Sequence, residues 1–150
     1  MALTVVEKVI LLQNVDVFTG VPTEQLGHMA AIAEVVAVLE DDVLYREGDE
    51  SNALYVVVDG SVRLHQGEET ITTATRSDAF GTWALLDAEP RVTSATVASD
   101  ARLLRIDRED FLELLADHSE ITQGVFKTVA GRMRRLLGRV QVDPPGRSRS

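Results

Sequence analysis

Cysteine is absent from the sequence, which excludes disulfide bonds, thiolate metal ligands and a cysteine nucleophile. Aromatic residues amount to only 5% of the 150 residues, and no apolar run approaches the ~18 residues that a membrane-spanning helix needs. The N-terminal segment is apolar, but Glu7, Lys8 and Gln13 interrupt it and no signal-peptide cleavage site follows. We therefore expect a cytoplasmic protein that does not insert into membranes.

Positive charge is also scarce, because 15 Lys and Arg face 24 Asp and Glu, which gives a net charge of −9. A general nucleic-acid-binding protein needs a basic face, so we expect no nucleic-acid partner. From Lys127 to the end, however, seven basic residues face one acid, a net +6, and the preceding residues carry −15. Two interpretations stay open for this basic end: a solvated helix face, or contact with an acidic surface of the same protein or of a partner.

Helical periodicity is found at both ends of the sequence. Residues 3–13 carry an apolar stripe, and a second helix is predicted to follow Pro22 with Thr23 as its N-cap. Near the C-terminus, Asp107 can cap a helix through "REDFLELLAD", and a longer amphipathic helix follows it. Residues 1–137 form a single predicted domain, and the Pro-, Gly- and Ser-rich segment 138–150 is predicted to be a disordered tail.

Between these helices the pattern is that of short strands. The strand-like runs are "VVAVLE", "VLYREGD", "LYVVVDGSVRLHQ", "TITTAT", "VTSATVAS" and "ARLLRID". Asp59 and Gly60 lie between two alternating runs and predict a hairpin turn. The predicted fold class is therefore mainly β with flanking α: an antiparallel, jelly-roll-like β-roll of about eight strands, with N-terminal helices and two C-terminal helices.

Three segments resemble the cyclic-nucleotide-binding domain family, of the catabolite-activator and protein-kinase-A regulatory-subunit type. The first is "YREGDESNALYVVVDGSVRL" (45–64), similar to the family's Gly-Asp turn and the strands beside it. The second is "FGTWALLDAEPR" (80–91), called the cassette below, which is similar to the family's phosphate-binding cassette. The third is "RLLRIDREDFLELL" (102–115), which looks like the last strand and the helix after it. Together they cover roughly residues 15–137.

The residues of the cassette suit an anionic ligand. Gly81 permits close approach of the backbone, and a short helix starting near Trp83 would point free N–H groups at an anion. Arg91 carries the planar guanidinium that matches phosphate oxygens. The resemblance implies that the phosphate of cAMP or cGMP is held by this Arg and by the next backbone N–H groups. The predicted ligand-binding residues are Phe80, Gly81, Thr82, Trp83, Ala84, Arg91, Val92 and Thr93.

The cassette also departs from the family pattern. Thr82 replaces the family's Glu, which accepts a hydrogen bond from the ribose 2′-hydroxyl. Loss of a hydrogen bond to a charged group costs roughly 1.5–3 kcal/mol, which predicts affinity weaker by about one to two decades. Trp83 replaces a smaller aliphatic residue and can either floor the purine site or fill it. Val92 replaces a residue that often carries a hydroxyl group.

The last predicted helix carries further candidates. Phe126, Val129 and Met133 lie where the resemblance places a hydrophobic lid over the base, although a buried stripe explains them equally well. The apolar face of this helix is also a candidate for pairing with a second copy or for contact with an effector domain. No DNA-reading helix follows residue 137, so a transcription factor of the catabolite-activator type is not expected. Whether the chain stands alone or is part of a larger protein stays open.

No pattern indicates catalysis or a metal site. His28, His65 and His118 are too dispersed for metal ligation, and no Gly-x-Ser-x-Gly motif is present. We therefore expect no enzyme activity, no metal and no cofactor other than a ligand. The leading hypothesis is a regulatory module that binds a cyclic nucleotide and signals through movement of its C-terminal helices. The alternative is a degenerate domain that no longer binds nucleotide and serves as an interaction scaffold.

Overall fold

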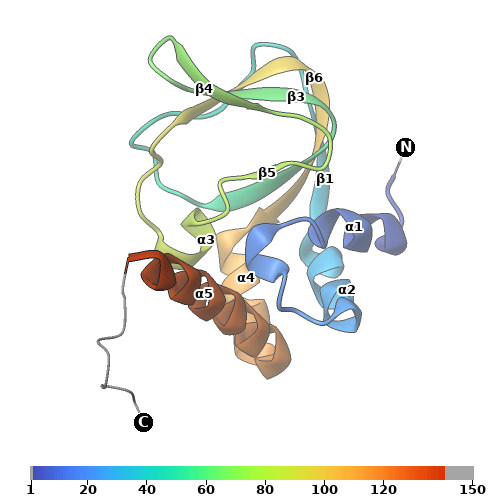
Figure 1. Ribbon diagram of the computed structural model, residues 1–150. Coiled ribbons are helices and arrows are strands. Elements are labelled where there is room, and N and C mark those ends of the chain that lie inside the picture. Colours follow the sequence, from blue (N-terminus) through green and yellow to red (C-terminus); the bar gives the residue numbers. More distant parts are fainter. Residues whose placement is uncertain (1, 141–150) are drawn as a thin grey trace.

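The computed structural model describes residues 2–140 and consists of a β-roll with helices gathered at one end of it (Figure 1). The elements in chain order are α1 (Val5–Leu12), η1 (Asp16–Phe18), α2 (Thr23–Ile32), β1 (Glu34–Val38), β2 (Val43–Tyr45), β3 (Ala53–Gln66), β4 (Glu69–Ala74), β5 (Ala79–Phe80), α3 (Ala84–Asp87), β6 (Ser94–Asp107), α4 (Arg108–Asp117) and α5 (Ser119–Val140). No helix within 2–140 combines the length and the apolar character needed to cross a membrane.

The sheet is antiparallel and is built around two long strands. Its order is β1-β6-β3-β4, with β2 also paired to β6 and β5 to β3. The predicted mainly-β class and the β-roll with helices at both ends of the chain are confirmed. The described residues form six strands, fewer than the predicted eight, because β3 and β6 are each 14 residues long and absorb two predicted runs apiece.

The hairpin predicted at Asp59 and Gly60 is wrong. β3 continues through both residues, and its register with β6 shifts on either side of Asp59. Gly60 has a φ of +87°, and a Cβ there would collide with the backbone of Asp100 and with Ala101. Glycine is therefore needed for a bulge that lets β3 and β6 approach closely, and not for a turn.

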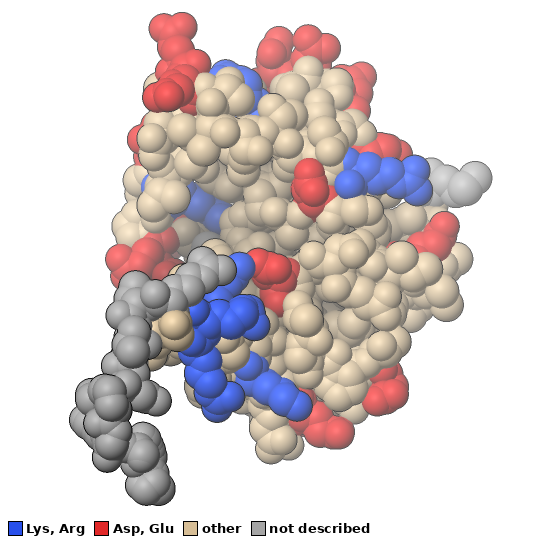
Figure 2. Space-filling model, viewed as in Figure 1, with Lys and Arg blue, Asp and Glu red and all other residues tan. Residues whose placement is uncertain are grey.

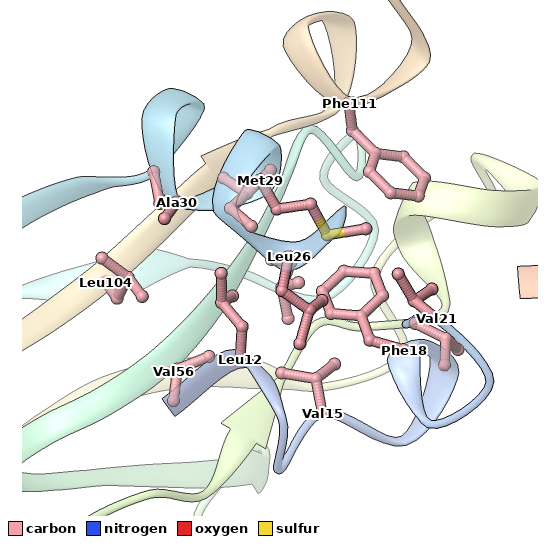
Figure 3. Packing of buried hydrophobic residues seen from close by; sticks show 14 of the residues in the cluster. Leu12, Val15, Phe18, Val21, Leu26, Met29, Ala30, Val56, Leu104 and Phe111 are labelled. Atoms are coloured by element: carbon pink, nitrogen blue, oxygen red, sulfur yellow. The ribbon is translucent and has the colours of Figure 1, made fainter. Parts of the chain in front are cut away.

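β3 separates two apolar cores. Leu54, Val56 and Val58 face the cluster formed with the helices, and Tyr55 and Val57 face the interior of the roll. Both faces of this strand are buried, which explains its unbroken apolar run. Figure 3 shows the first cluster, where side chains from α1, η1, α2 and α4 pack over Val56 and Leu104; the labelled residues are Leu12, Val15, Phe18, Val21, Leu26, Met29, Ala30, Val56, Leu104 and Phe111.

The helix boundaries differ in detail from the predictions. α1 begins with a complete capping box between Thr4 and Glu7. α2 begins one residue earlier than predicted, so that Thr23 is its first helical residue and no side chain caps it. The short helix η1 had no sequence signal. α5 extends to Val140, so 138–140 are helical, and the rest of the predicted tail lies outside the described residues.

A glycine contact holds α5 against the loop before α2. A Cβ on Gly124 would lie 2.8 Å from the carbonyl oxygen of Gly20, and the Gly20 N–H donates to the hydroxyl of Thr128 at 2.8 Å. The two backbones therefore touch directly. The Arg132 side chain of α5 lies over the Trp83 ring, one residue before α3, the short helix within the cassette.

Candidate functional site

Arg91 lies at the end of the cassette and is only 6% exposed. Its Nη2 donates a hydrogen bond to the carbonyl oxygen of Ala53 in β3 at 2.7 Å. Its Nε is buried without a hydrogen-bond partner, and Arg91 belongs to none of the ion pairs found among residues 2–140. Burial lowers the pKa of Arg91, against the opposing effect of Tyr45 and other neighbours. The charge of Asp49 acts on the guanidinium from beyond ion-pairing distance, so this buried cation has no directly paired anion among residues 2–140, and the geometry favours an anionic ligand here.

Tyr45 supports the guanidinium of Arg91. The Arg91 Cζ lies 3.9 Å from the centre of the Tyr45 ring, which is a cation–π contact. The Tyr45 ring packs in turn against Tyr55 and Phe80, and these two rings stack with centres 5.2 Å apart. Burial raises the pKa of Tyr45, although the charge of Arg91 and a hydrogen bond with Thr93 act in the opposite direction. Phe80 therefore acts inside the aromatic cluster that fixes Arg91.

Gly81 is required by the position of Arg91. Its φ is +74°, and a Cβ there would lie 2.5 Å from Nη1 of Arg91 and 3.1 Å from the Ala53 oxygen. Any other residue would combine backbone strain with displacement of the guanidinium. The sequence predicted that the backbone at Gly81 is closely approached, and the group that approaches it is the buried guanidinium of Arg91.

The cassette is attached to the loop between β2 and β3 by hydrogen bonds to its backbone. The Arg91 N–H donates to the Asp49 oxygen at 2.9 Å, and the Gly48 N–H donates to the Arg91 oxygen at 2.8 Å. The hydroxyl of Ser51 donates to the carbonyl oxygen of Glu89. Tyr45, Ser51 and the Ala53 carbonyl were not among the predicted site residues, although all three lie within the first segment that resembles the family.

A pocket of about 220 Å³ opens in front of Arg91. Its lining is formed by the cassette, the segment after it, and residues from β2, β3 and the loop between them: Tyr45, Ser51, Leu64, Gly81, Thr82, Trp83, Asp87, Glu89, Pro90, Arg91, Val92 and Thr93. Small-molecule pockets usually measure about 300–1,000 Å³, so this one is small as the protein stands. Six predicted ligand-binding residues line it, namely Gly81, Thr82, Trp83, Arg91, Val92 and Thr93. Phe80 belongs instead to the aromatic cluster beside Arg91, and Ala84 is the first residue of α3.

Two residues that depart from the family pattern, Trp83 and Val92, lie at the rim of this pocket. Trp83 is 40% exposed, and its ring centre lies 5.0 Å from Cζ of Arg132 in α5. It is thus neither a core residue nor buried in the pocket. Val92 is 75% exposed, and its carbonyl oxygen accepts a hydrogen bond from Gln66. Thr82 is half-buried and lines the pocket.

The candidate lid residues do not line the pocket. Val129 is half-buried and packs against the helical core, whereas Phe126 and Met133 are 70% and 57% exposed. Their assignment as a lid stays a prediction. Two more apolar residues of α5, Leu136 and Leu137, are exposed beyond them.

The histidines are less dispersed than the sequence suggested. The rings of His28 in α2 and His118 before α5 stack with centres 4.1 Å apart, so the prediction of wide separation is wrong for this pair. His65 lies elsewhere and bonds to Gly67 and Thr96. Within residues 2–140, no three His, Cys, Asp or Glu side chains come together as metal ligands would.

These features define a β-roll domain with a small pocket built around a buried arginine. The chain belongs to the cyclic nucleotide-binding domain family, which its residues 35–118 match. The family resemblance inferred from the three segments is therefore confirmed.

The proteins similar to this chain include a transcriptional regulator and a much longer lysophospholipase. It is 27% identical over 146 residues to a CRP-like cAMP-activated global transcriptional regulator of Mycobacterium tuberculosis, covering 91% of this chain and 65% of that protein. It is 30% identical over 124 residues to a lysophospholipase of Emericella nidulans, covering 79% of this chain and 8% of that protein. The chain thus spans less than two thirds of the length of either relative.

A solved structure supports the same fold. The N-terminal domain of a transcriptional regulator from Streptomyces coelicolor A3(2) superposes with a TM-score of 0.79 at 26% identity, covering 91% of this chain and 99% of that one. Similarity therefore extends from the helices before the roll to those after it.

Proposed function

We propose that this domain is a regulatory module that binds a cyclic nucleotide, cAMP or cGMP, with the cyclic phosphate on Arg91. The observation that carries the proposal is the buried guanidinium of Arg91, which is fixed by Ala53 and Tyr45 and has an unpartnered Nε. A phosphate oxygen would supply a directly paired negative charge and a hydrogen-bond acceptor. Membership of the family and the name of the cAMP-activated relative point to the same ligand class.

Backbone groups beside Arg91 complete the proposed phosphate site. Among residues 2–140, no protein acceptor bonds the N–H groups of Val92 and Thr93. Both residues line the pocket, and they follow Arg91 directly. Two backbone donors next to a guanidinium form the kind of preorganised cradle that an anion requires.

The departures at Thr82 and Val92 are expected to weaken binding and not to abolish it. Thr82 can offer a hydroxyl to the ribose but no charge, which favours a dissociation constant about one to two decades higher than with Glu. The alternative hypothesis, a degenerate domain that no longer binds nucleotide, rests on these residues and on Trp83. The retained geometry of Arg91, Gly81 and Tyr45 argues against it.

We further propose that α5 reports occupancy of the pocket. Trp83 belongs to the cassette and contacts Arg132 of α5, so a ligand that moves the cassette also disturbs this helix. The exposed apolar residues of α5, Phe126, Met133, Leu136 and Leu137, would then be covered by an effector domain or by a second copy of the chain. A non-catalytic role in the cytoplasm stays a prediction.

Calorimetric titration with cAMP and cGMP tests the proposal. Arg91→Gln is the test variant, and Arg46→Gln is the matched control, because Arg46 carries the same charge but is exposed. We expect binding in the parent and in the control and none in Arg91→Gln. Saturation at ~100 times the dissociation constant should add about 2.7 kcal/mol of stability, which a melting curve detects. Equal binding by Arg91→Gln and the parent would refute the proposal.

A further inference from the structure

A second hollow, of about 460 Å³, lies between η1 and α5. It is roughly twice the volume of the pocket at Arg91 and falls within the ~300–1,000 Å³ range usual for ligand sites. Its lining comes from two segments far apart in the sequence: Asp16, Thr19, Gly20, Lys127, Thr128, Gly131, Arg132 and Arg135. We call it the η1–α5 groove.

The groove concentrates positive charge on an acidic protein. Three cations, Lys127, Arg132 and Arg135, face a single carboxylate, Asp16, so the lining carries +2 although the chain carries −9. Figure 2 shows Lys and Arg side chains gathered over α5. The ion pairs among residues 2–140 include Arg132 with Asp16 at 2.6 Å but neither of the other two cations. Lys127 and Arg135 thus line the hollow without an ion-pair partner among the described residues.

The charge of the lining distinguishes between ligands. A phosphate monoester carries about −1.5 to −2 at neutral pH, which balances the +2 of the groove, whereas a single carboxylate leaves an excess of one. The guanidinium of Arg135 offers paired donors for phosphate oxygens, and Lys127 adds a point charge. A phosphate therefore satisfies the groove better than a carboxylate of similar size does.

The groove is also connected to the cassette through one residue. Arg132 lines the groove, pairs with Asp16, and lies with its Cζ 5.0 Å from the ring centre of Trp83. Trp83 is the only tryptophan of the chain. An anion that draws Arg132 away from Asp16 therefore changes the surroundings of the single strong fluorophore.

We propose that the η1–α5 groove is a second ligand site, distinct from the cassette pocket, that takes a phosphate-bearing anion on Lys127, Arg132 and Arg135. This proposal goes beyond nucleotide binding at Arg91 and does not depend on it. A small phosphate compound and a phosphorylated protein segment share the required chemistry.

Titration with inorganic phosphate and pyrophosphate, at an ionic strength held constant with KCl, tests the second site by calorimetry and Trp83 fluorescence. The test variant is Lys127→Gln/Arg135→Gln, whose two positions are exposed, so folding is preserved. The control is Arg134→Gln, an exposed cation of the same helix that does not line the groove. We expect saturable binding and a fluorescence change in the parent and the control, and affinity at least about tenfold weaker in the double variant.

Backbone amide shifts in NMR spectra separate this site from the cassette. Phosphate should shift the amides of Thr19, Gly20 and Gly131, and it should still do so in Arg91→Gln. Shifts confined to Gly81 and Thr93 would overturn the proposal, as would equal weakening in Arg134→Gln or the absence of saturable binding. Titrations with free O-phosphoserine and with a phosphoserine peptide then distinguish the two sources of phosphate. Equal affinity for the two compounds supports a small phosphate ligand, and tighter binding of the peptide supports a phosphorylated protein segment.

Discussion

Replacement of Gly81 by alanine tests how the cassette positions its arginine. The φ of Gly81 is +74°, and the new Cβ would lie 2.5 Å from Nη1 of Arg91. The guanidinium has to move, and movement breaks its hydrogen bond to the carbonyl oxygen of Ala53. The variant should therefore be less stable than the parent and should also lose affinity for a cyclic nucleotide.

The magnitude follows from two contributions. A non-glycine residue in the left-handed region costs about 1–2 kcal/mol, partly offset because alanine restricts the unfolded chain. Loss of a hydrogen bond from a charged group costs a further ~1.5–3 kcal/mol. We expect Gly81→Ala to destabilise the fold by about 3 kcal/mol, equivalent to a decrease of about 9 °C in the melting temperature for a domain of this size.

Gly67→Ala is the matched control for this experiment. Gly67 also has a positive φ, +57°, but nothing lies within 4 Å of the Cβ that alanine would add. It should therefore cost only the backbone strain, about 1 kcal/mol. Urea unfolding of both variants measures the difference. If Gly81→Ala were no more destabilising than Gly67→Ala, the contact between Gly81 and Arg91 would have no energetic role and the reasoning would fail.

Three other predictions concern the helices and the surface of the roll. Gly124→Ala should destabilise the protein by about 1–3 kcal/mol through overpacking, whereas Gly27→Ala, with nothing within 4 Å of its Cβ, should stabilise α2 by up to about 1 kcal/mol; thermal melts showing the same sign for both would contradict this. Thr4→Ala removes the capping box of α1 and should cost about 1 kcal/mol in urea unfolding, an outcome that equal midpoints would exclude. A hydrogen bond from Arg102 lowers the pKa of Asp59. The pair therefore stabilises the fold above the unfolded-state pKa of ~3.9, and this contribution disappears as the pH falls through the folded-state pKa. An NMR titration should find the Asp59 pKa below ~3.9, and Arg102→Ala should raise it.

The sequence predicted those parts of the site that lie in one continuous segment. Gly81 and Arg91 belong to the cassette, where the residue types and the resemblance to the family together indicate an anion site. Tyr45 and Ala53 were missed because they contact Arg91 across gaps of 46 and 38 residues, which no local pattern records. The pairing of these residues depends on how β2, β3 and the cassette come together in the roll.

Two features of the fold depend on contacts between distant segments. The Asp59–Gly60 pair predicts a hairpin from turn preference alone, but the long pairing of β3 with β6 imposes a bulge there instead. Trp83 lies under Arg132, which is held by Asp16 from a segment 116 residues away in sequence. No local pattern in the sequence records either contact.

The attachment of the cassette to the roll has a consequence for how such domains diversify. All three hydrogen bonds that hold it to the β2–β3 loop use main-chain atoms of the cassette, from Glu89 and Arg91. Substitution along the cassette therefore leaves these connections in place, because every residue type except proline supplies the same N–H and carbonyl groups. Substitutions at Thr82, Trp83 or Val92 can change which ligand fits the pocket while the hydrogen bonds between the cassette and the β2–β3 loop stay in place. Ligand preference and fold are therefore free to evolve at different rates.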